Sequence, residues 1–395
     1  MGFTIKRGGI VMEQIVAFLT NGEMMNLNRI DDDIIVSGEF QAKGFITKII
    51  IPEDIKRIGE KAFKDCDNLE EVIFPNGLED IYPSAFENCK KLKKINLPNS
   101  VEMIGQDAFK CCEELSEVVL PAQIDIIAEG CFDGCRSLKE ISLPKTVTTI
   151  GARAFRGTGL TEIYFPENLM KVGTSAFAGS NIAKVTGNTK NIVFVGYTAF
   201  ESTPISLKRD ENDVFRIDDI ILFAGATPKE MMFENCLFAS GCFSKNKTTK
   251  ELLLVNCKGI NPATFSESNV EVVQITGHWF TVSMNAFEKC KIRRLEIDTN
   301  TIVLSSYAFK EAKITDLFLW ADDISFNLEF ARDAHIKSFA LKYNPNSITY
   351  DNETFMDGVF EEISFVGGAE IDMYTIPNNE EIVNILNSVY KKESA

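Results

Sequence analysis

Four cysteines in two neighbouring stretches of the chain are the residues best suited to chemistry. Cys111 and Cys112 are adjacent, and Cys131 and Cys135 form a Cys-x-x-x-Cys pair. Four thiolates can hold zinc in a tetrahedral site. A repeat in the sequence, described below, explains three of them without a metal, because Cys112 and Cys135 occupy a small-residue column and Cys131 replaces an alanine. We therefore expect free thiols and no metal site.

Histidine is the usual partner of a nucleophilic cysteine or serine, and the chain has two, His278 and His335. The sequence contains no Gly-x-Ser-x-Gly, His-Glu-x-x-His, P-loop or Gly-x-Gly-x-x-Gly motif. Trp279 could stack against a ligand, but it takes the position that Ile55 takes in an earlier repeat, so we expect it in the core. The sequence predicts no catalytic residue and no cofactor. An enzyme with a site near an insertion after Thr203 is the alternative.

A repeat of fixed length must position these side chains. The dipeptide Ala-Phe recurs, once with Cys131 in place of alanine, and the phenylalanines are spaced by 23, 23, 23, 23, 22 and 23 residues. They are Phe63, Phe86, Phe109, Phe132, Phe155, Phe177 and Phe200. A period this strict predicts units that cannot bury their apolar faces alone and stack on one another as a solenoid.

Each repeat begins with alternating apolar residues, the pattern of a short strand with one buried face. A proline follows the strand in six repeats: Pro52, Pro75, Pro98, Pro121, Pro144 and Pro166. Proline has no N–H to donate, so it ends the strand pairing. We expect short parallel strands on the concave face, with turns and short 3-10 or helical segments on the other sides. The phenylalanines form the core, and glycines such as Gly105 need positive φ or close backbone approach.

The register breaks after Thr203, and the next candidate phenylalanine is Phe243. The later repeats lack the proline. The segment from Asn212 to Phe223 is predicted to form a hairpin. The predicted organisation is one continuous solenoid with five parts: 1–44 as the N-terminal cap region, 45–206 as regular repeats, 207–242 as an irregular insertion, 243–366 as degenerate repeats, and 367–395 as a C-terminal cap. Val11 to Thr20 is expected to form a short capping element, and the tail from Pro377 a capping helix, because its apolar residues have helical spacing.

Leu-Pro, Ile-Gly, Ala-Phe and Cys at a 23-residue period, over roughly Phe45 to Phe365, resemble the BspA-like leucine-rich repeat family. The segment from Asn212 to Phe223 is similar to a hairpin that interrupts many repeats of that family, with Asp219 where glycine is usual. The resemblance implies a right-handed superhelical or horseshoe solenoid. It also implies a protein common in bacteria, often at the cell surface, where family members bind host proteins.

The net charge of −16 and a pI near 4.8 argue against nucleic acid and anionic membranes as partners. No apolar run has the length of a membrane span, and the interrupted apolar stretch after Arg7 predicts no signal peptide. Translation from Met12 is our expectation. Ten cysteines in repeat columns favour buried free thiols in the cytoplasm. The family resemblance favours the alternative, a cell-surface or secreted protein. A monomer is expected.

Two columns of side chains point outward from the predicted strands of the first repeats. The charged column is Lys48, Glu71, Lys94, Glu117, Glu140, Glu162 and Lys184. The other column, which we call the first-unit stripe, is Ile50, Ile73, Asn96, Val119, Ser142, Tyr164 and Thr186. Opposite charges on adjacent strands could simply fix the strand register. Exposed aliphatic residues have no such structural purpose, although strand propensity also favours them.

These observations predict a non-catalytic module that binds a protein partner through the concave sheet face. The candidate contact residues are the first-unit stripe together with Glu71, Lys94, Glu117 and Glu140. An adhesin that binds a host protein or glycan is the alternative within the same fold. A passive spacer would show no preferred face.

Overall fold

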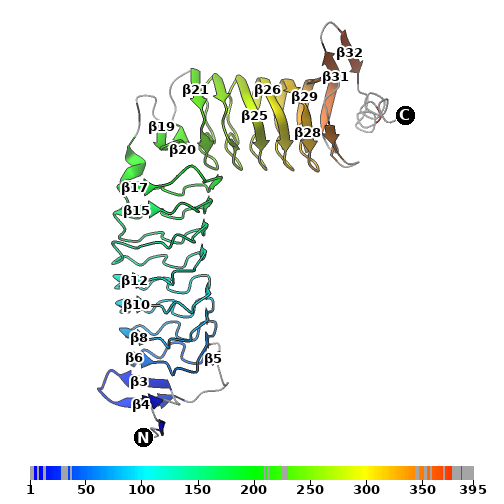
Figure 1. Cartoon of the computed structure of the whole chain (residues 1–395). Helices are drawn as coiled ribbons and strands as arrows, with labels where there is room; N and C mark the ends of the chain where they lie inside the picture. Colours follow the sequence, from blue (N-terminus) through cyan, green and yellow to red (C-terminus); the bar gives the residue numbers. More distant parts are fainter. Residues whose placement is uncertain are drawn as a thin grey trace. The chain divides into compact units, whose positions relative to one another are not determined.

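The computed structural model divides into two compact units, Met1–Lys208 and Arg209–Ala395, and each unit is a β-solenoid (Figure 1). The structure describes residues 4–6, 9–11, 15–27, 34–35, 38–208, 210, 214–224, 230–342, 347–350, 354–355, 358–367, 370–375 and 384. The predicted solenoid with parallel strands is confirmed in both units. The boundaries between cap, repeats and insertion stay predictions.

The first unit has one column of short strands at the predicted positions. They are β6 (Ile46–Ile50), β8 (Glu71–Ile73), β10 (Lys94–Asn96), β12 (Glu117–Val119), β15 (Glu162–Phe165) and β17 (Lys184–Gly187). β6, β8, β10 and β12 pair in parallel, as do β15 and β17. The register places Ile49, Val72 and Ile95 opposite one another on the core side. Alternation along each strand then sends the charged column and the first-unit stripe outward.

A second column of two-residue strands occupies a side that the sequence analysis assigned to turns. Its members are β5 (Ile34–Ile35), β7 (Arg57–Ile58), β9 (Asp80–Ile81), β11 (Met103–Ile104), β13 (Ile126–Ile127), β14 (Thr149–Ile150), β16 (Lys171–Val172) and β18 (Phe194–Val195). These strands are too short for period-2 alternation to be visible in the sequence. A 3-10 helix of three residues, η1 (Ile205–Leu207), is present in the described part of the unit.

The prolines make the corner between the two strand columns. The Pro75 carbonyl accepts a hydrogen bond from the Leu78 amide at 3.3 Å, and the Pro98 carbonyl accepts one from Val101 at 3.1 Å. Leu78 and Val101 are buried, so each turn returns an apolar side chain to the core. Proline favours such turns because its φ is already fixed.

Stacked phenylalanine rings fill the interior of the first unit, as predicted. Ring centroids of successive rungs lie 5.1 to 5.8 Å apart from Phe40 to Phe200, and the rings are within 17° of parallel. Phe40 adds a rung before Phe63 that the Ala-Phe pattern did not reveal, because Glu39 stands in place of alanine. Gly105 sits where a Cβ would lie 2.6 Å from the Pro83 backbone nitrogen, so close approach is what favours glycine there.

The second unit begins with the expected hairpin, β19 (Val214–Ile217) paired antiparallel with β20 (Ile220–Ala224). Parallel strands then follow: β21 (Glu230–Glu234), β22 (Leu237–Phe238), β23 (Glu251–Val255), β24 (Gly259–Ile260), β25 (Val272–Val282), β26 (Lys291–Leu304), β27 (Lys313–Trp320), β28 (Asp323–Phe326), β29 (His335–Lys342), β30 (Ser347–Thr349) and β31 (Val359–Gly367). β25 and β26 span 11 and 14 residues. Each runs through the corner that the prolines make in the first unit.

Each solenoid has antiparallel strands on the side of a chain terminus. At the N-terminal side β1 (Thr4–Lys6) pairs with β2 (Gly9–Val11), and β3 (Ile15–Leu19) pairs with β4 (Met24–Leu27) and with β6. The capping element expected near Val11 to Thr20 is therefore largely a strand. β32 (Glu370–Thr375) pairs antiparallel with β31. The helix expected from Pro377 lies outside the described residues except for position 384, and the structure does not support it.

Candidate interaction surfaces

The first-unit stripe lies on the outward face of the strands, in register from β6 to β12 and again from β15 to β17. Ile50 on β6 lies opposite Ile73 on β8. Asn96 on β10 lies opposite Val119 on β12. Ile73, Val119 and Tyr164 are 41%, 50% and 57% exposed. The structure brings these predicted residues together on one face, with Asn96 and Ser142 exposed and Ile50 and Thr186 half-buried. Several large apolar side chains this exposed on one face are typical of an interaction surface.

The charged column forms the ion-pair ladder that could fix strand register. Lys48 Nζ lies 2.7 Å from Glu71 Oε2, Lys94 Nζ lies 2.5 Å from Glu117 Oε2, and Lys184 Nζ lies 3.3 Å from Glu162 Oε2. Three pairs of opposite charge therefore connect adjacent rungs. These contacts explain Glu71, Lys94 and Glu117 structurally. Glu140 has no basic side chain within ion-pair distance in the part of the chain that the structure describes.

The strand column is interrupted at the repeat that carries Glu140. Among the described residues one sheet ends at β12 and another begins at β15, so residues 140–142 join neither. A shallow depression of about 510 Å³ opens at this break. Its lining includes Glu117, Val119, Glu140, Ser142, Glu162 and Tyr164. We call it the acidic depression, and it combines three carboxylates with two exposed apolar side chains.

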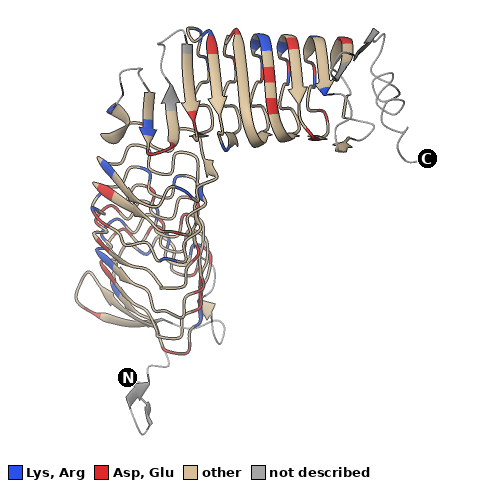
Figure 2. Cartoon of the chain, turned by 45° about the horizontal axis from the view of Figure 1, so that its top comes forward, with Lys and Arg blue, Asp and Glu red and all other residues tan. Residues whose placement is uncertain are grey.

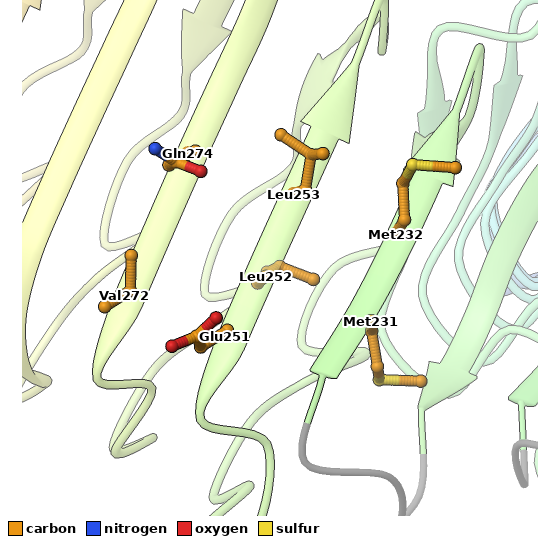
Figure 3. Close-up of a pocket in the computed structure, with 7 residues that line it drawn as sticks. All are labelled: Met231, Met232, Glu251, Leu252, Leu253, Val272 and Gln274. Atoms are coloured by element: carbon orange, nitrogen blue, oxygen red, sulfur yellow. The ribbon is translucent and has the colours of Figure 1, made fainter.

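The second unit has an apolar depression that the sequence analysis missed. Figure 3 shows Met232, Leu253 and Gln274 at matching positions on β21, β23 and β25. The depression has a volume of about 330 Å³, and Met232 on its edge is 65% exposed. Leu253 lies between the inward residues Leu252 and Leu254, and Gln274 lies between Val273 and Ile275, so period-2 alternation places both on the outward face. That alternation was the signal that could have found this surface.

An aromatic and charged cluster lies on the same outward face, on β26 and β27. Arg294 Nη2 donates to Glu296 Oε2 at 2.9 Å, and Trp320 Nε1 donates to Glu296 Oε1 at 3.0 Å. The Arg294 guanidinium lies 4.8 Å from the Phe318 ring centroid, and Phe318 stacks on Trp320. Burial opposes ionisation of Glu296, but hydrogen bonds from Arg294, Trp320 and Gln274 outweigh it and lower the pKa of this carboxyl. The cluster satisfies its own polar groups.

Comparison with known proteins identifies the repeat. A family model described as a BspA type leucine rich repeat region matches residues 33–157, 103–222 and 237–360, with 6 copies. The chain belongs to this family. No curated protein matches the chain. Leucine-rich repeats and other solenoids present extended surfaces for protein binding.

Several solved structures are similar to this BspA-type chain. A leucine rich cell surface protein from Faecalibacterium prausnitzii A2-165 aligns with a TM-score of 0.42 and 18% identity, over 90% of this chain and 93% of that chain. A leucine-rich repeat protein from Bacteroides ovatus ATCC 8483 aligns with a TM-score of 0.31 and 16% identity, over 90% and 99%. The T. pallidum leucine rich repeat protein aligns with a TM-score of 0.30 and 21% identity, over 47% and 86%.

Trp279 is 66% exposed, so its predicted place in the core was wrong. In the first unit the buried residues Ile55 and Ile58 are three apart, because the proline turn separates them. In this second-unit repeat the strand continues, and the buried residues are Phe280 and Val282, two apart. Phe280 therefore fills the core where Trp279 was expected, and the indole faces solvent.

The cysteines of this BspA-type protein are free, and all except the half-buried Cys111 are buried. The thiols of Cys66, Cys89 and Cys112 donate to the backbone carbonyls of Phe40, Phe63 and Phe86, at 3.1 to 3.3 Å. The small-residue column is thus also a column of hydrogen-bond donors, which the sequence analysis did not anticipate. Burial raises the pKa of Cys66 to about 11 and also holds the pKa of Cys89 well above the usual value of a thiol. Thiols held protonated are poor nucleophiles and poor metal ligands.

The remaining candidates for chemistry are dispersed. Within the described ranges, no group of three or more His, Cys, Asp and Glu side chains is placed to hold a metal ion. His278 Nδ1 lies 3.3 Å from Asn300 Oδ1, and His335 Nε2 lies 2.6 Å from Glu361 Oε1. Both histidines therefore interact with polar surface groups on neighbouring strands. No helix in the described part of the chain has the length and apolar character needed to span a membrane.

Proposed function

We propose that this BspA-type leucine-rich repeat protein is a non-catalytic recognition module that binds a protein partner through the first-unit stripe. The observation that supports the proposal most is the exposure of Val119 and Tyr164 beside the acidic depression. Tyrosine is enriched among the residues that dominate binding energy at protein interfaces. The rigid ladder of β8, β10 and β12 holds the stripe in a fixed arrangement, which lowers the entropy cost of binding.

The charges of the acidic depression indicate the chemistry of the partner. Lys94 and Lys184 offset Glu117 and Glu162, whereas Glu140 between them carries an uncompensated charge. A partner segment with an apolar side chain for Val119 and Tyr164 and a Lys or Arg for Glu140 would complement this surface. Ser142 is small and exposed, and leaves room for that basic side chain.

The chemistry of the other side chains supports a non-catalytic role. Burial raises the pKa of the cysteine thiols, and the two histidines interact with Asn300 and Glu361 rather than with a nucleophile. A nucleophile needs an adjacent base within hydrogen-bond reach. Binding through a preformed surface needs no such arrangement.

The experiment that tests this function compares two double variants as immobilised bait for lysate and medium of the native host. Val119→Asp with Tyr164→Asp changes the stripe. Met103→Asp with Ile126→Asp is the matched control, because these residues lie on the second strand column and are 39% and 48% exposed. We expect a protein captured by wild type and control to be lost from the stripe variant.

A photo-crosslinking side chain at Ser142 gives an independent measurement. The crosslinker should attach the same captured protein, because Ser142 lines the acidic depression. Thermal melting of each bait verifies that it is folded. Equal capture by both double variants, or crosslinking to no captured protein, would reject the stripe as the binding surface.

A further inference from the structure

A basic depression lies in the second unit of a chain whose net charge is −16. Its volume is about 510 Å³, and five cationic side chains contribute to its lining: Lys247, Lys250, Lys291, Arg293 and Lys313. Glu271 is the acidic residue among those that line it. Figure 2 shows basic residues at the start of β26, followed along the same strand by acidic ones. Positive charge is therefore concentrated at the beginning of these strands.

The strand register places like charges opposite one another here. Lys291 on β26 is the direct neighbour of Lys313 on β27. Adjacent strands are only about 4.8 Å apart, and like charges directly opposite are destabilising. In the charged column of the first unit, by contrast, direct neighbours have opposite charge, as in Lys48 with Glu71 and Lys94 with Glu117. Stability by itself would favour a glutamate at one of the two lysine positions.

Of the five cationic groups, Lys250 is the one with a described carboxylate at ion-pair distance, although the same carboxylate, Glu271, also attracts Arg293 at longer range. Lys250 Nζ lies 2.5 Å from Glu271 Oε1, and Lys247 Nζ contacts the Glu267 backbone carbonyl. Lys291, Arg293 and Lys313 are exposed, and no described carboxylate lies within 4.0 Å of their nitrogen atoms. The next basic group in register with Lys313 is His335, which is paired with Glu361. Positive charge without a direct ion pair is therefore concentrated at the starts of β26 and β27, and Lys247 adds to it.

The surroundings of the depression restrict the size of its occupant. Glu251 and Glu271 lie at the strand starts on one side, and Glu361 and Glu362 on the other. A long polyanion would extend over these carboxylates and be repelled. The lining has no exposed large apolar residue, since Ile292 is buried. A short stretch of carboxylates fits both observations, and one guanidinium can bind a carboxylate in a bidentate manner.

We propose that this depression binds a short acidic segment of a protein, with two or three carboxylates facing Lys291, Arg293 and Lys313. The site lies in the second unit and is independent of the first-unit stripe. Lys291 and Lys313 repel each other in the free protein, and the carboxylates of a bound acidic segment would offset that repulsion.

A fluorescein-labelled peptide with four consecutive glutamates, flanked by Gly and Ser, is the probe, and its anisotropy with the full chain is the measurement. Lys313→Glu creates an opposite-charge pair with Lys291, so it should weaken peptide binding by about tenfold and raise the melting temperature. A gain in stability shows that the variant is folded. Binding by wild type should weaken as salt increases.

Lys139→Glu is the matched control, because Lys139 is an exposed lysine of the first unit and the change in net charge is the same. It should alter peptide affinity by less than about twofold. Undiminished binding by Lys313→Glu overturns the proposal, and so does the absence of binding by wild type at low salt. Tighter binding of single-stranded DNA or heparin than of the peptide assigns the depression to a different polyanion and also overturns it.

Discussion

In the first unit a proline follows most strands of the first column, whereas in the second unit the same position holds Thr276, Asp298 and Trp320. Where proline is present, the strands of both columns are two to five residues long and a turn separates them. Where it is absent, β25 and β26 run for 11 and 14 residues. The absence of proline thus permits a continuous strand but does not require one, because β23 and β24, and likewise β27 and β28, are separate strands in repeats without proline at this position.

The same difference changes which side chains face the core. In a repeat with a turn, consecutive buried residues are three positions apart in the sequence, as are Ile55 and Ile58. In a repeat with a continuous strand they are two positions apart, as are Phe280 and Val282. The outward surfaces also differ. The first unit connects its rungs with opposite charges beside the first-unit stripe, and the second unit carries a basic depression with one ion pair and an aromatic cluster. One repeat family therefore supports two surfaces of different chemistry.

The largest expected effect comes from the phenylalanine stack. Phe109→Ala should lower the free energy of unfolding of the first unit by about 3–5 kcal/mol, because it leaves a cavity between two stacked rings. Both tryptophans lie in the second unit, so their fluorescence reports that unit alone. In urea, circular dichroism should show an early transition while tryptophan fluorescence is unchanged.

Phe287→Ala is the counterpart in the second unit, where Phe287 stacks between Phe265 and Phe309. This variant should shift the tryptophan transition by a similar amount. If Phe109→Ala moves both transitions equally, the two compact units unfold as one cooperative structure. That result would contradict the expectation that each unit unfolds separately.

Placing proline in the second unit tests its role in dividing the strands. Asp298→Pro should cost about 3 kcal/mol, since Asp298 lies within β26 between β25 and β27, and its side chain is exposed. The reverse change, Pro98→Ala in the first unit, should cost less than about 1 kcal/mol. Urea denaturation gives both values. A neutral Asp298→Pro would contradict our explanation of the long strands.

The position four residues before each core phenylalanine should show a smaller difference in stability between the two units. A side chain at Gly105 would lie within 2.8 Å of backbone atoms of Tyr82 and Pro83, so Gly105→Ser should cost about 1–3 kcal/mol. Ser283 stands four residues before Phe287 in the second unit, and Ser283→Gly should cost less than about 1 kcal/mol. A thermal stability left unchanged by Gly105→Ser would contradict the close backbone approach at this position.

The smallest effects should come from the exposed charges, and their signs should differ between the units. Lys94→Met removes the partner of Glu117 and should lower stability by less than about 1 kcal/mol. Lys313→Met removes a like-charge neighbour of Lys291 and should raise stability slightly. Melting at low and high salt measures both, and high salt should reduce each difference. Destabilisation by Lys313→Met would mean that the lysine pair is not repulsive.

Much of the candidate surface could be predicted because a strand has a period of two. Knowing that Ile49 and Val72 face the core was enough to place Ile50 and Ile73 outside. The break at residues 140–142 was not predictable, because the residues there follow the same pattern as in paired strands. Trp279 was misplaced because the template of the first unit was carried over to a repeat without the turn.

The amino-acid sequence by itself determined the repeat, the stacked phenylalanine core, the inward and outward faces of the strands, and the family. These properties depend on local periodicity, which a chain shows without any distant contact. The tertiary structure decided which outward residues meet. The acidic depression combines side chains from several rungs, and the basic depression brings Lys291 beside Lys313, 22 positions along the chain. Such neighbours exist only once the rungs stack, because register between strands, and not distance along the chain, places them together.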